Sequence, residues 1–287
     1  MPPGSLSLYW ESCRAGALAA ASNYTAAVRS ESPDWTDAAA SQRSILETLI
    51  AVRPHAILIA PADPAELTPL LQQASGAGIA IGLIETRCET PDETPEETPY
   101  AVCVRTDDAE AGRLAARHLA AKITEGGGAA TVVAADDPGS VSKDAFIAEL
   151  GAVPKPVSVT ELTLDFADEI AALRQANALL RAPAKIQGVF CVAERTSIAL
   201  ARAARRIGTT LPIVGYGRDF SLRQALRDGA IDALVVPDAF QVGYSALEAI
   251  AGPSQNAAAR RIEIPPRLIT RDNLDSQETR AFLDPAF

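Results

Sequence analysis

The stretch AILIAPADPAELTPLLQQASGAGIAIGLI, residues 56–84, decides the fold class. An aliphatic run of strand length, AILIA, precedes the helix-period segment 64–76, and a second aliphatic run, IAIGLI, follows at 79–84. A strand, a helix and a strand in succession predict a parallel βαβ unit. We therefore expect an α/β protein built on parallel sheets.

The same alternation extends outward from this stretch. A helix is predicted before it, at 36–52, and helix-period segments follow at 107–122, 142–150, 168–182, 195–206, 219–228 and 240–251. The predicted strands between and after them are 101–104, 130–134, 156–162, 188–192, 212–216, 233–236, 260–264 and 267–270, and a short helix closes the chain. Two arrays of about five strands exceed one comfortable sheet. We therefore predict two doubly wound lobes divided near Thr106.

Composition and charge limit the possible functions. The chain has 287 residues, enough for two cores of about 100–150 residues each. Its net charge of -10 and its lack of a basic stripe argue against a nucleic-acid partner, because phosphate binding needs clustered Lys and Arg. The longest apolar runs are much shorter than the roughly 20 residues of a membrane helix. We expect no direct membrane insertion.

Catalytic and metal-binding patterns are poor. His55 and His118 fit surface or packing positions better than a general base. The four cysteines lack CxxC spacing, which indicates buried thiols and no metal, although Cys88 and Cys103 flank one loop and could pair in an oxidising compartment. Asp107 is predicted to cap a helix. We expect no enzyme activity and no cofactor.

Ligands of open parallel sheets bind outside the carboxyl ends of the strands. The polar residues that follow the predicted strands include Glu85, Thr86, Arg87, Asp136, Asp137, Ser142, Glu194, Arg195, Arg218, Asp219 and Asp238. Near the amino terminus, Tyr9 and Trp10 offer two adjacent rings that could grip the apolar face of a sugar. The alternative is that both rings start a helix and pack in the core.

Segments spread along almost the whole chain carry a family resemblance. They are SLYWESCRAGALAAA (7–21), AILIAPADPAELTPLLQQASGAGIAI (56–81), TDDAEAGRLAARHLA (106–120), QGVFCVAERTSIALARAARRIG (187–208), LPIVGYGRD (211–219), GAIDALVVPDAFQVGYSALEAI (229–250) and LITRDNLDSQETRAFLDP (268–285). In this order and spacing the chain resembles the periplasmic sugar-binding proteins of the ribose-binding type, which are type I periplasmic binding proteins. These are related to the effector-binding lobes of lac-repressor-family regulators.

The resemblance implies a fold of two lobes joined by three crossing segments, with a ligand enclosed by hinge closure. The lobes would comprise 1–106 with 239–266, and 107–238 with 267–287. The implied function is that of the substrate-binding component of an ABC-type importer, which delivers a sugar or sugar-like solute to a membrane permease from the periplasm. The alternative is the effector-binding domain of a lac-repressor-family regulator that lacks its helix-turn-helix.

One departure from the family concerns the amino terminus. Only MPPGSLSL precedes the aromatic pair, where the family has a full apolar strand. The first strand is therefore expected to be missing or shortened, and we expect the natural start to lie upstream of Met1, or else GSLSL to supply a stunted strand.

The family's sugar contacts carry over only in part. The aromatic contacts fall at Tyr9, Trp10 and Phe166, and a carboxylate contact falls at Glu85. Other expected contacts are replaced: two arginines by Thr86 and Ser142, an asparagine by Ala193 beside Glu194, an aspartate by Gly217 and a glutamine by Pro237. Each lost charge-assisted hydrogen bond is worth about 1.5–3 kcal/mol. The resemblance therefore implies an atypical or modified sugar, or another small polar molecule, with neighbours such as Arg218 and Asp238 in contact.

The complete set of predicted ligand-binding residues combines strand-end positions with these carried-over positions. It comprises Ser7, Tyr9, Trp10, Glu85, Thr86, Ser142, Phe166, Glu194, Arg218 and Asp238.

Overall fold

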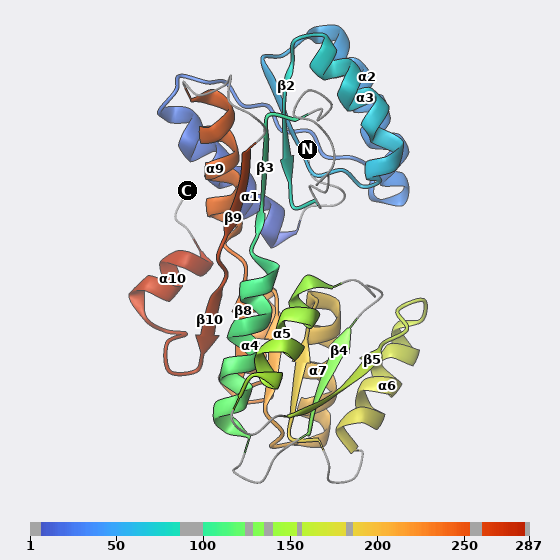
Figure 1. Ribbon diagram of the computed structural model, residues 1–287, viewed down its shortest axis with the longest axis vertical. Helices are drawn as coiled ribbons and strands as arrows, with labels where there is room; N and C mark the ends of the chain where they lie inside the picture. The colour runs from blue at the N-terminus through green and yellow to red at the C-terminus, as the bar shows by residue number, and fades with distance from the viewer. Residues whose placement is uncertain are drawn as a thin grey trace. The chain divides into compact units, whose positions relative to one another are not determined.

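A computed structural model describes residues 7–86, 100–123, 129–134, 140–153, 157–181, 186–252 and 260–284 (Figure 1). The chain divides into two compact units. Unit 1 comprises Met1–Thr106 and Asp238–Ile264, and unit 2 comprises Asp107–Pro237 and Pro265–Ala286. The chain thus passes from one unit to the other three times.

Unit 1 is built on a parallel sheet. Its elements are α1 (Leu8–Ser22), the 3-10 turn η1 (Trp35–Asp37), α2 (Ala38–Val52), β1 (Ala56–Ile59), α3 (Pro64–Gly76), β2 (Ala80–Ile84), β3 (Val102–Thr106), α9 (Ala239–Ala251) and β9 (Arg260–Ile264). The strand order is β1-β2-β3-β9, with every pair parallel. The strand–helix–strand unit that the sequence predicts at 56–84 is therefore confirmed.

Unit 2 contains the longer sheet. Its elements are α4 (Asp108–Lys122), β4 (Ala129–Ala134), α5 (Val141–Gly151), β5 (Ser158–Thr163), α6 (Glu169–Arg181), β6 (Gly188–Cys191), α7 (Glu194–Ile207), β7 (Ile213–Tyr216), α8 (Phe220–Asp228), β8 (Ala233–Val236), β10 (Arg267–Thr270) and α10 (Gln277–Leu283). The order is β10-β8-β7-β6-β4-β5, and only the β10–β8 pair is antiparallel among the described strands. The predicted fold class, α/β with parallel sheets, is confirmed.

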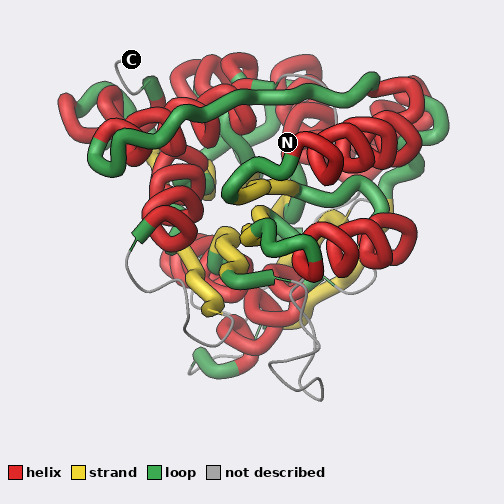
Figure 2. Tube along the Cα trace, turned by 90° about the horizontal axis from the view of Figure 1, so that it is seen from above, coloured by secondary structure: helices red, strands yellow, loops and turns green. Residues whose placement is uncertain are grey.

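Helices cover both faces of each sheet. In unit 1, alternate residues of β3 point to opposite sides, since Val102 and Val104 pack towards α9 while Cys103 packs with α2 and α3. In Figure 1, α2 and α3 lie on one side of this sheet, and α1 and α9 lie on the other. Figure 2 shows the same layering by colour, with yellow strands between red helices.

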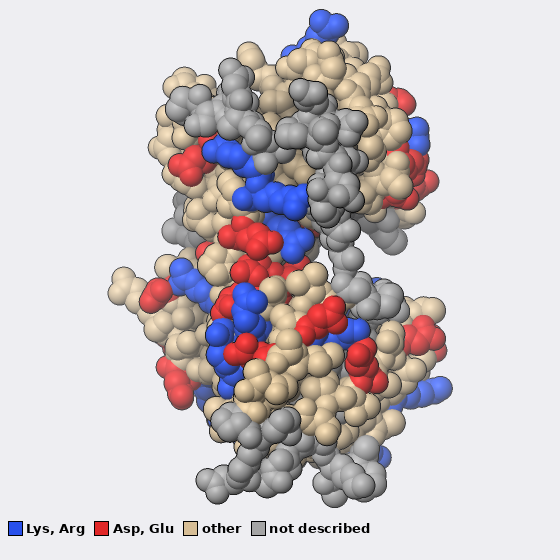
Figure 3. Space-filling model, viewed as in Figure 1, with Lys and Arg blue, Asp and Glu red and all other residues tan. Residues whose placement is uncertain are grey.

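Unit 2 repeats this arrangement. Phe190 of β6 packs with α4 and α5, whereas its neighbours Val189 and Cys191 pack with α6, α7 and α8. Figure 1 shows α4 and α5 in front of the strands and α7 behind them. On the solvent side of α4, Arg113 and Arg117 pair with Glu110, and Figure 3 shows acidic and basic side chains intermingled over this helix.

Local sequence explains where the helices begin. Asp63 accepts a hydrogen bond from the backbone N–H of Glu66 (3.0 Å) and is followed by Pro64, the residue best suited to a first helical turn. Asp107 accepts from the N–H of Glu110 (2.8 Å). The predicted capping role of Asp107 is therefore confirmed.

Two cysteines behave as the sequence predicts. Cys13 and Cys191 are free and buried, and burial raises the pKa of each thiol to about 12. Both are therefore inert at neutral pH. Cys103 is disulfide-bonded. Cys88, which the sequence leaves open as a partner, lies outside the described residues, as do residues 4–6 of the GSLSL segment.

Among the described helices, none combines the length and the apolar character that a membrane crossing requires.

Candidate ligand-binding site

The strand ends of unit 1 bring an aromatic ring to a buried carboxylate. Glu85 follows β2 and Thr106 ends β3, and these two strands are parallel neighbours, so both residues lie at the same sheet edge. Glu85 Oε1 accepts hydrogen bonds from the Thr106 N–H (3.0 Å), from the Thr106 hydroxyl (2.8 Å) and from the Tyr9 hydroxyl. We call Tyr9, Trp10, Glu85 and Thr106 the aromatic–carboxylate cluster.

Glu85 is held in an unusual state. Its φ of 50° lies in the left-handed region, which is costly for a residue with a Cβ and is typical of functional sites. Burial raises the pKa of its carboxyl group, while the hydrogen bonds from Tyr9 and Thr106 oppose that rise. The carboxylate is therefore preorganised at the end of β2.

The aromatic pair starts a helix and packs partly in the core, as the alternative interpretation predicts, whereas its contact with a sugar stays a prediction. Tyr9 and Trp10 form the first turn of α1, and both rings pack partly against the core of unit 1. The rings meet edge to face, 5.0 Å apart, which is a favourable aromatic geometry. Ser7 caps this helix by accepting a hydrogen bond from the Trp10 N–H (3.4 Å). Ser7 thus orients the first turn of α1.

In unit 2, Glu194 explains one departure from the family pattern. Its Oε2 accepts hydrogen bonds from the N–H groups of Arg218 (2.7 Å) and Asp219 (3.1 Å). Gly217 has a φ of +118°, and a Cβ on it would lie 2.5 Å from Glu194 Oε2. Glycine therefore leaves the space that this carboxylate fills, and Glu194 brings a carboxylate close to the position where the resemblance expects an aspartate.

Other predicted residues of unit 2 are bound into the fold. The Ser142 side chain is buried, with its Oγ 3.0 Å from that of Ser140, the cap of α5. Arg218 is also buried and donates a hydrogen bond to the carbonyl of Leu283 in α10 (2.6 Å). Both side chains therefore have structural partners.

Asp238 and Thr86 both belong to unit 1. Asp238 caps α9 by accepting a hydrogen bond from the Gln241 N–H (3.0 Å). Thr86 is half-buried directly after Glu85. Asp136 and Asp137, polar residues that follow a predicted strand, lie outside the described residues, as does Arg87.

Phe166 has a cation as its neighbour. The guanidinium carbon of Arg195 lies 4.5 Å from the centre of the Phe166 ring, and one Arg195 nitrogen lies 3.4 Å from the Phe166 carbonyl oxygen. Phe166 follows β5 and Arg195 follows β6, at the same edge of the sheet. Unit 2 thus presents an aromatic ring and a guanidinium together at its strand ends.

Three candidate residues were not in the predicted ligand-binding set, although Arg195 was among the strand-end residues that the sequence offered. Thr106, Arg195 and Phe220 all follow or end strands, and Phe220 is 64% exposed at the start of α8. Position after a strand was the available signal for each. The sequence does not show which strand-end side chains can still bind a ligand. This depends on the hydrogen bonds that each side chain makes in the folded structure.

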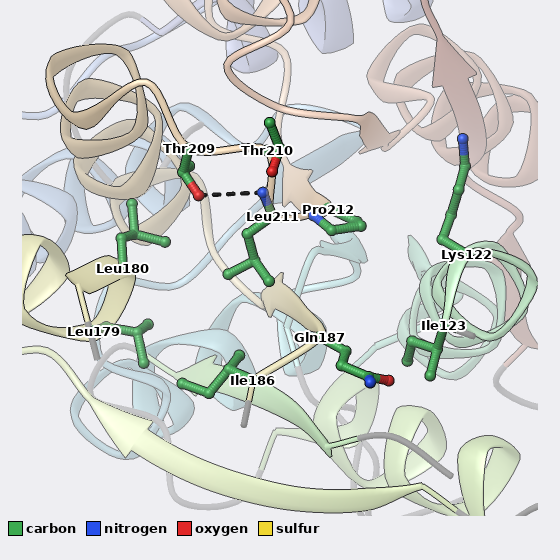
Figure 4. A pocket seen from close by; sticks show the side chains of 10 residues that line it. All are labelled: Lys122, Ile123, Leu179, Leu180, Ile186, Gln187, Thr209, Thr210, Leu211 and Pro212. Atoms are coloured by element: carbon green, nitrogen blue, oxygen red, sulfur yellow. Dashed lines mark hydrogen bonds between the residues drawn. The ribbon is translucent and has the colours of Figure 1, made fainter. Parts of the chain in front are cut away.

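A separate cavity of about 380 Å³ lies at the opposite edge of the unit 2 sheet (Figure 4). It is bordered by the residues that precede β6 and β7, including Gln187 and Pro212. Leu179, Leu180 and Ile186 supply apolar walls. Because parallel sheets bind ligands at the carboxyl ends of their strands, this cavity does not match the predicted ligand position.

His118 is paired with an acidic side chain, and the described part of the chain holds no metal-binding cluster. His118 contacts the carboxylate of Asp232, which also lies 3.7 Å from Lys122 Nζ. No cluster of three or more His, Cys, Asp or Glu side chains suited to a metal occurs among the described residues.

Comparisons with known proteins agree with this architecture. Residues 1–252 match the model of the family described as "Periplasmic binding protein domain". A comparison with curated protein sequences gave no match.

Among solved structures, a solute-binding protein of an ABC transporter from Agrobacterium vitis with bound D-fucose is 25% identical. The match covers 98% of this chain and 97% of that one, with a TM-score of 0.79. A second Agrobacterium vitis solute-binding protein, bound to alpha-D-tagatopyranose, is 23% identical over 98% and 96% of the two chains, also with a TM-score of 0.79. A periplasmic ribose ABC transporter protein from Conexibacter woesei is 17% identical over 96% and 91%, with a TM-score of 0.80.

Proposed function

The chain belongs to the periplasmic binding protein domain family, and on this premise we propose that it is the substrate-binding component of an ABC-type importer. Its solute is a sugar or a sugar-like small polar molecule. The compared structures are solute-binding proteins of ABC transporters, and two of them hold sugars. These relatives favour transport over the regulatory alternative.

The aromatic–carboxylate cluster is the observation that carries the proposal. A sugar ring offers apolar C–H faces and polar hydroxyl edges, so it is held best by a flat ring beside a fixed hydrogen-bond acceptor. Tyr9 supplies the ring, and Glu85 supplies the acceptor to which the Tyr9 hydroxyl is bonded. Phe166 and Arg195 offer a second aromatic surface at the strand ends of unit 2.

Location and partner belong to the same proposal. The family implies a location outside the cytoplasm, and we propose the periplasm, with a membrane permease as partner. The disulfide at Cys103 supports an oxidising compartment. The predicted lobe boundaries and ligand-binding residues remain part of this proposal.

Calorimetric titration tests ligand binding. The panel contains D-fucose, D-tagatose, D-arabinose, D-ribose and modified sugars, with mannitol as an acyclic control. At a ligand concentration about one hundred times the dissociation constant, binding should raise the free energy of unfolding by about 2.7 kcal/mol. If no sugar in the panel binds, the proposal is wrong; tight binding of plain ribose would instead contradict the expected preference for an atypical sugar.

A matched pair of variants tests the role of the ring. Tyr9→Phe keeps the aromatic face, whereas Tyr9→Leu removes it, so only the second should lower sugar affinity strongly. Equal losses of sugar affinity in the two variants would assign the effect to the hydroxyl.

Cell fractionation separates the transport function from the regulatory alternative, because a cytoplasmic location would favour the regulator.

A further inference from the structure

Arg195 differs from Arg218, the other candidate cation of unit 2, and from Lys143 of α5. Arg218 is buried and bonded to the Leu283 carbonyl, and Lys143 is buried with its Nζ 2.7 Å from Glu161. Arg195 is exposed, and no carboxylate within the described part of the chain forms an ion pair with it. Its charge is therefore available to a ligand.

The way Arg195 is held suits the binding of an anion. Its guanidinium lies over the Phe166 ring at 4.5 Å, so one flat face of the group is occupied. A guanidinium carries its five N–H donors in the plane, at its edge. Only one nitrogen is directed at the Phe166 carbonyl, at 3.4 Å. The remaining donors match the two oxygens of a carboxylate.

Acidic side chains near Arg195 accept hydrogen bonds from backbone N–H groups: Asp165 from Ala167, and Asp168 from Ile170. Glu194, the neighbour of Arg195 in sequence, accepts hydrogen bonds at Oε2 from the N–H groups of Arg218 and Asp219. Asp219 caps α8, because its Oδ1 accepts a hydrogen bond from the backbone N–H of Ser221 (2.7 Å). The chain's net charge of -10 repels anions at long range, but salt screens this beyond a Debye length of about 8 Å. Local contacts therefore decide the preference.

We propose that the solute is an acidic sugar, such as a uronate or an aldonate, whose carboxylate binds Arg195. This inference rests on the proposed function and narrows its substrate class. Arg195 would act as the specificity residue.

Paired titrations test the inference on the unaltered protein. D-galactose is compared with D-galacturonate, D-glucose with D-glucuronate, and D-arabinose with D-arabinonate. We expect at least one acid to bind about tenfold or more tightly than its neutral partner, as a charge-assisted pair provides. If neutral sugars bind as well as every acid, the inference is wrong and the proposed function stands. If neither class binds, the proposed function fails as well.

Variants of Arg195 assign the preference to this side chain. Arg195→Gln should weaken binding of the acid by about tenfold or more and leave the neutral partner nearly unchanged. Arg195→Lys keeps the charge without the planar guanidinium, so its affinity for the acid should lie between those of the wild type and Arg195→Gln. Arg202→Gln, on the exposed side of the same helix, is the matched control. An acid preference that survives in Arg195→Gln would overturn the inference, and circular dichroism confirms that each variant is folded.

Discussion

At the scale of single residues, Glu85 shows how local strain and burial produce a site. Its left-handed backbone turns the chain directly after β2, and the side chain then reaches Thr106 and Tyr9. Such a conformation persists only where surrounding contacts over-determine it. The three hydrogen bonds to Oε1 supply these contacts. They fix the position of the carboxylate, and they also lower its pKa against the effect of burial.

The raised pKa of Glu85 predicts a pH-dependent stability. The folded protein binds this proton more tightly than the unfolded chain, so ionisation costs stability as the pH rises from the ordinary value of 4.5 through the folded pKa. Glu85→Gln keeps an Oε1 acceptor and cannot ionise. We expect the free energy of unfolding of Glu85→Gln, relative to that of the wild type, to change little below pH 4.5 and to increase as the pH rises.

Urea unfolding at a series of pH values measures this difference in free energy. Glu47→Gln, at an exposed position of α2, is the matched control. An advantage of Glu85→Gln that shrinks with rising pH would show that the hydrogen bonds, and not burial, dominate this carboxyl group.

Arg218 gives a second prediction at this scale. Its hydrogen bond to the Leu283 carbonyl fastens α10, and losing the donor should lower the free energy of unfolding by about 1.5–3 kcal/mol. Arg218→Met retains the apolar stem, and Arg206→Met on α7 serves as an exposed control. The expected result is lost stability with hydrogen exchange concentrated in α10. Lost ligand affinity at full stability would instead make Arg218 a ligand contact.

At the scale of elements, α1 and α9 approach each other through two glycines. A Cβ on Gly16 would lie 1.9 Å from the Phe240 carbonyl oxygen, and one on Gly243 would lie 1.8 Å from that of Cys13. No side chain fits at either position without moving backbone. The two helices, far apart in sequence, thus cover one face of the unit 1 sheet in close contact.

Gly243→Ala should therefore destabilise unit 1 more than an alanine normally does. Overpacking costs about 1–3 kcal/mol, whereas Gly76→Ala meets nothing within 4 Å and should gain up to about 1 kcal/mol from helix propensity. Denaturant unfolding of both variants gives the comparison. Equal effects would mean that α1 and α9 adjust freely to the added methyl group.

At the scale of the whole molecule, three chain crossings connect two units that each have their own sheet and core. A few linking residues can absorb a change of backbone angles, so the hinge closure that the family resemblance implies stays a prediction.

Small-angle scattering checks this prediction. We expect the radius of gyration to fall when a tightly binding sugar is added and to stay constant with mannitol. A bound ligand that leaves the radius of gyration unchanged would mean that the hinge-closure prediction is wrong.

The sequence alone determined the α/β class and most element positions. The aliphatic run 233–236 became β8 with the predicted bounds, because burial on both faces of a parallel sheet demands continuous apolar residues. The predicted strand 260–264 became β9, also with the predicted bounds. Asp63 and Asp107 marked helix starts through their own side chains. These signals are local, so they can be read without the fold.

Only the tertiary structure decided which strand-end residues remain available to a ligand. Arg218 and Arg195 look alike in sequence, yet one is buried against Leu283 and the other lies exposed over Phe166. The closeness of Tyr9 to Glu85, and of Glu194 to Gly217, likewise depends on segments far apart in the chain. Residue type sets what a side chain can bind, but its partner depends on which groups folding brings within hydrogen-bond distance.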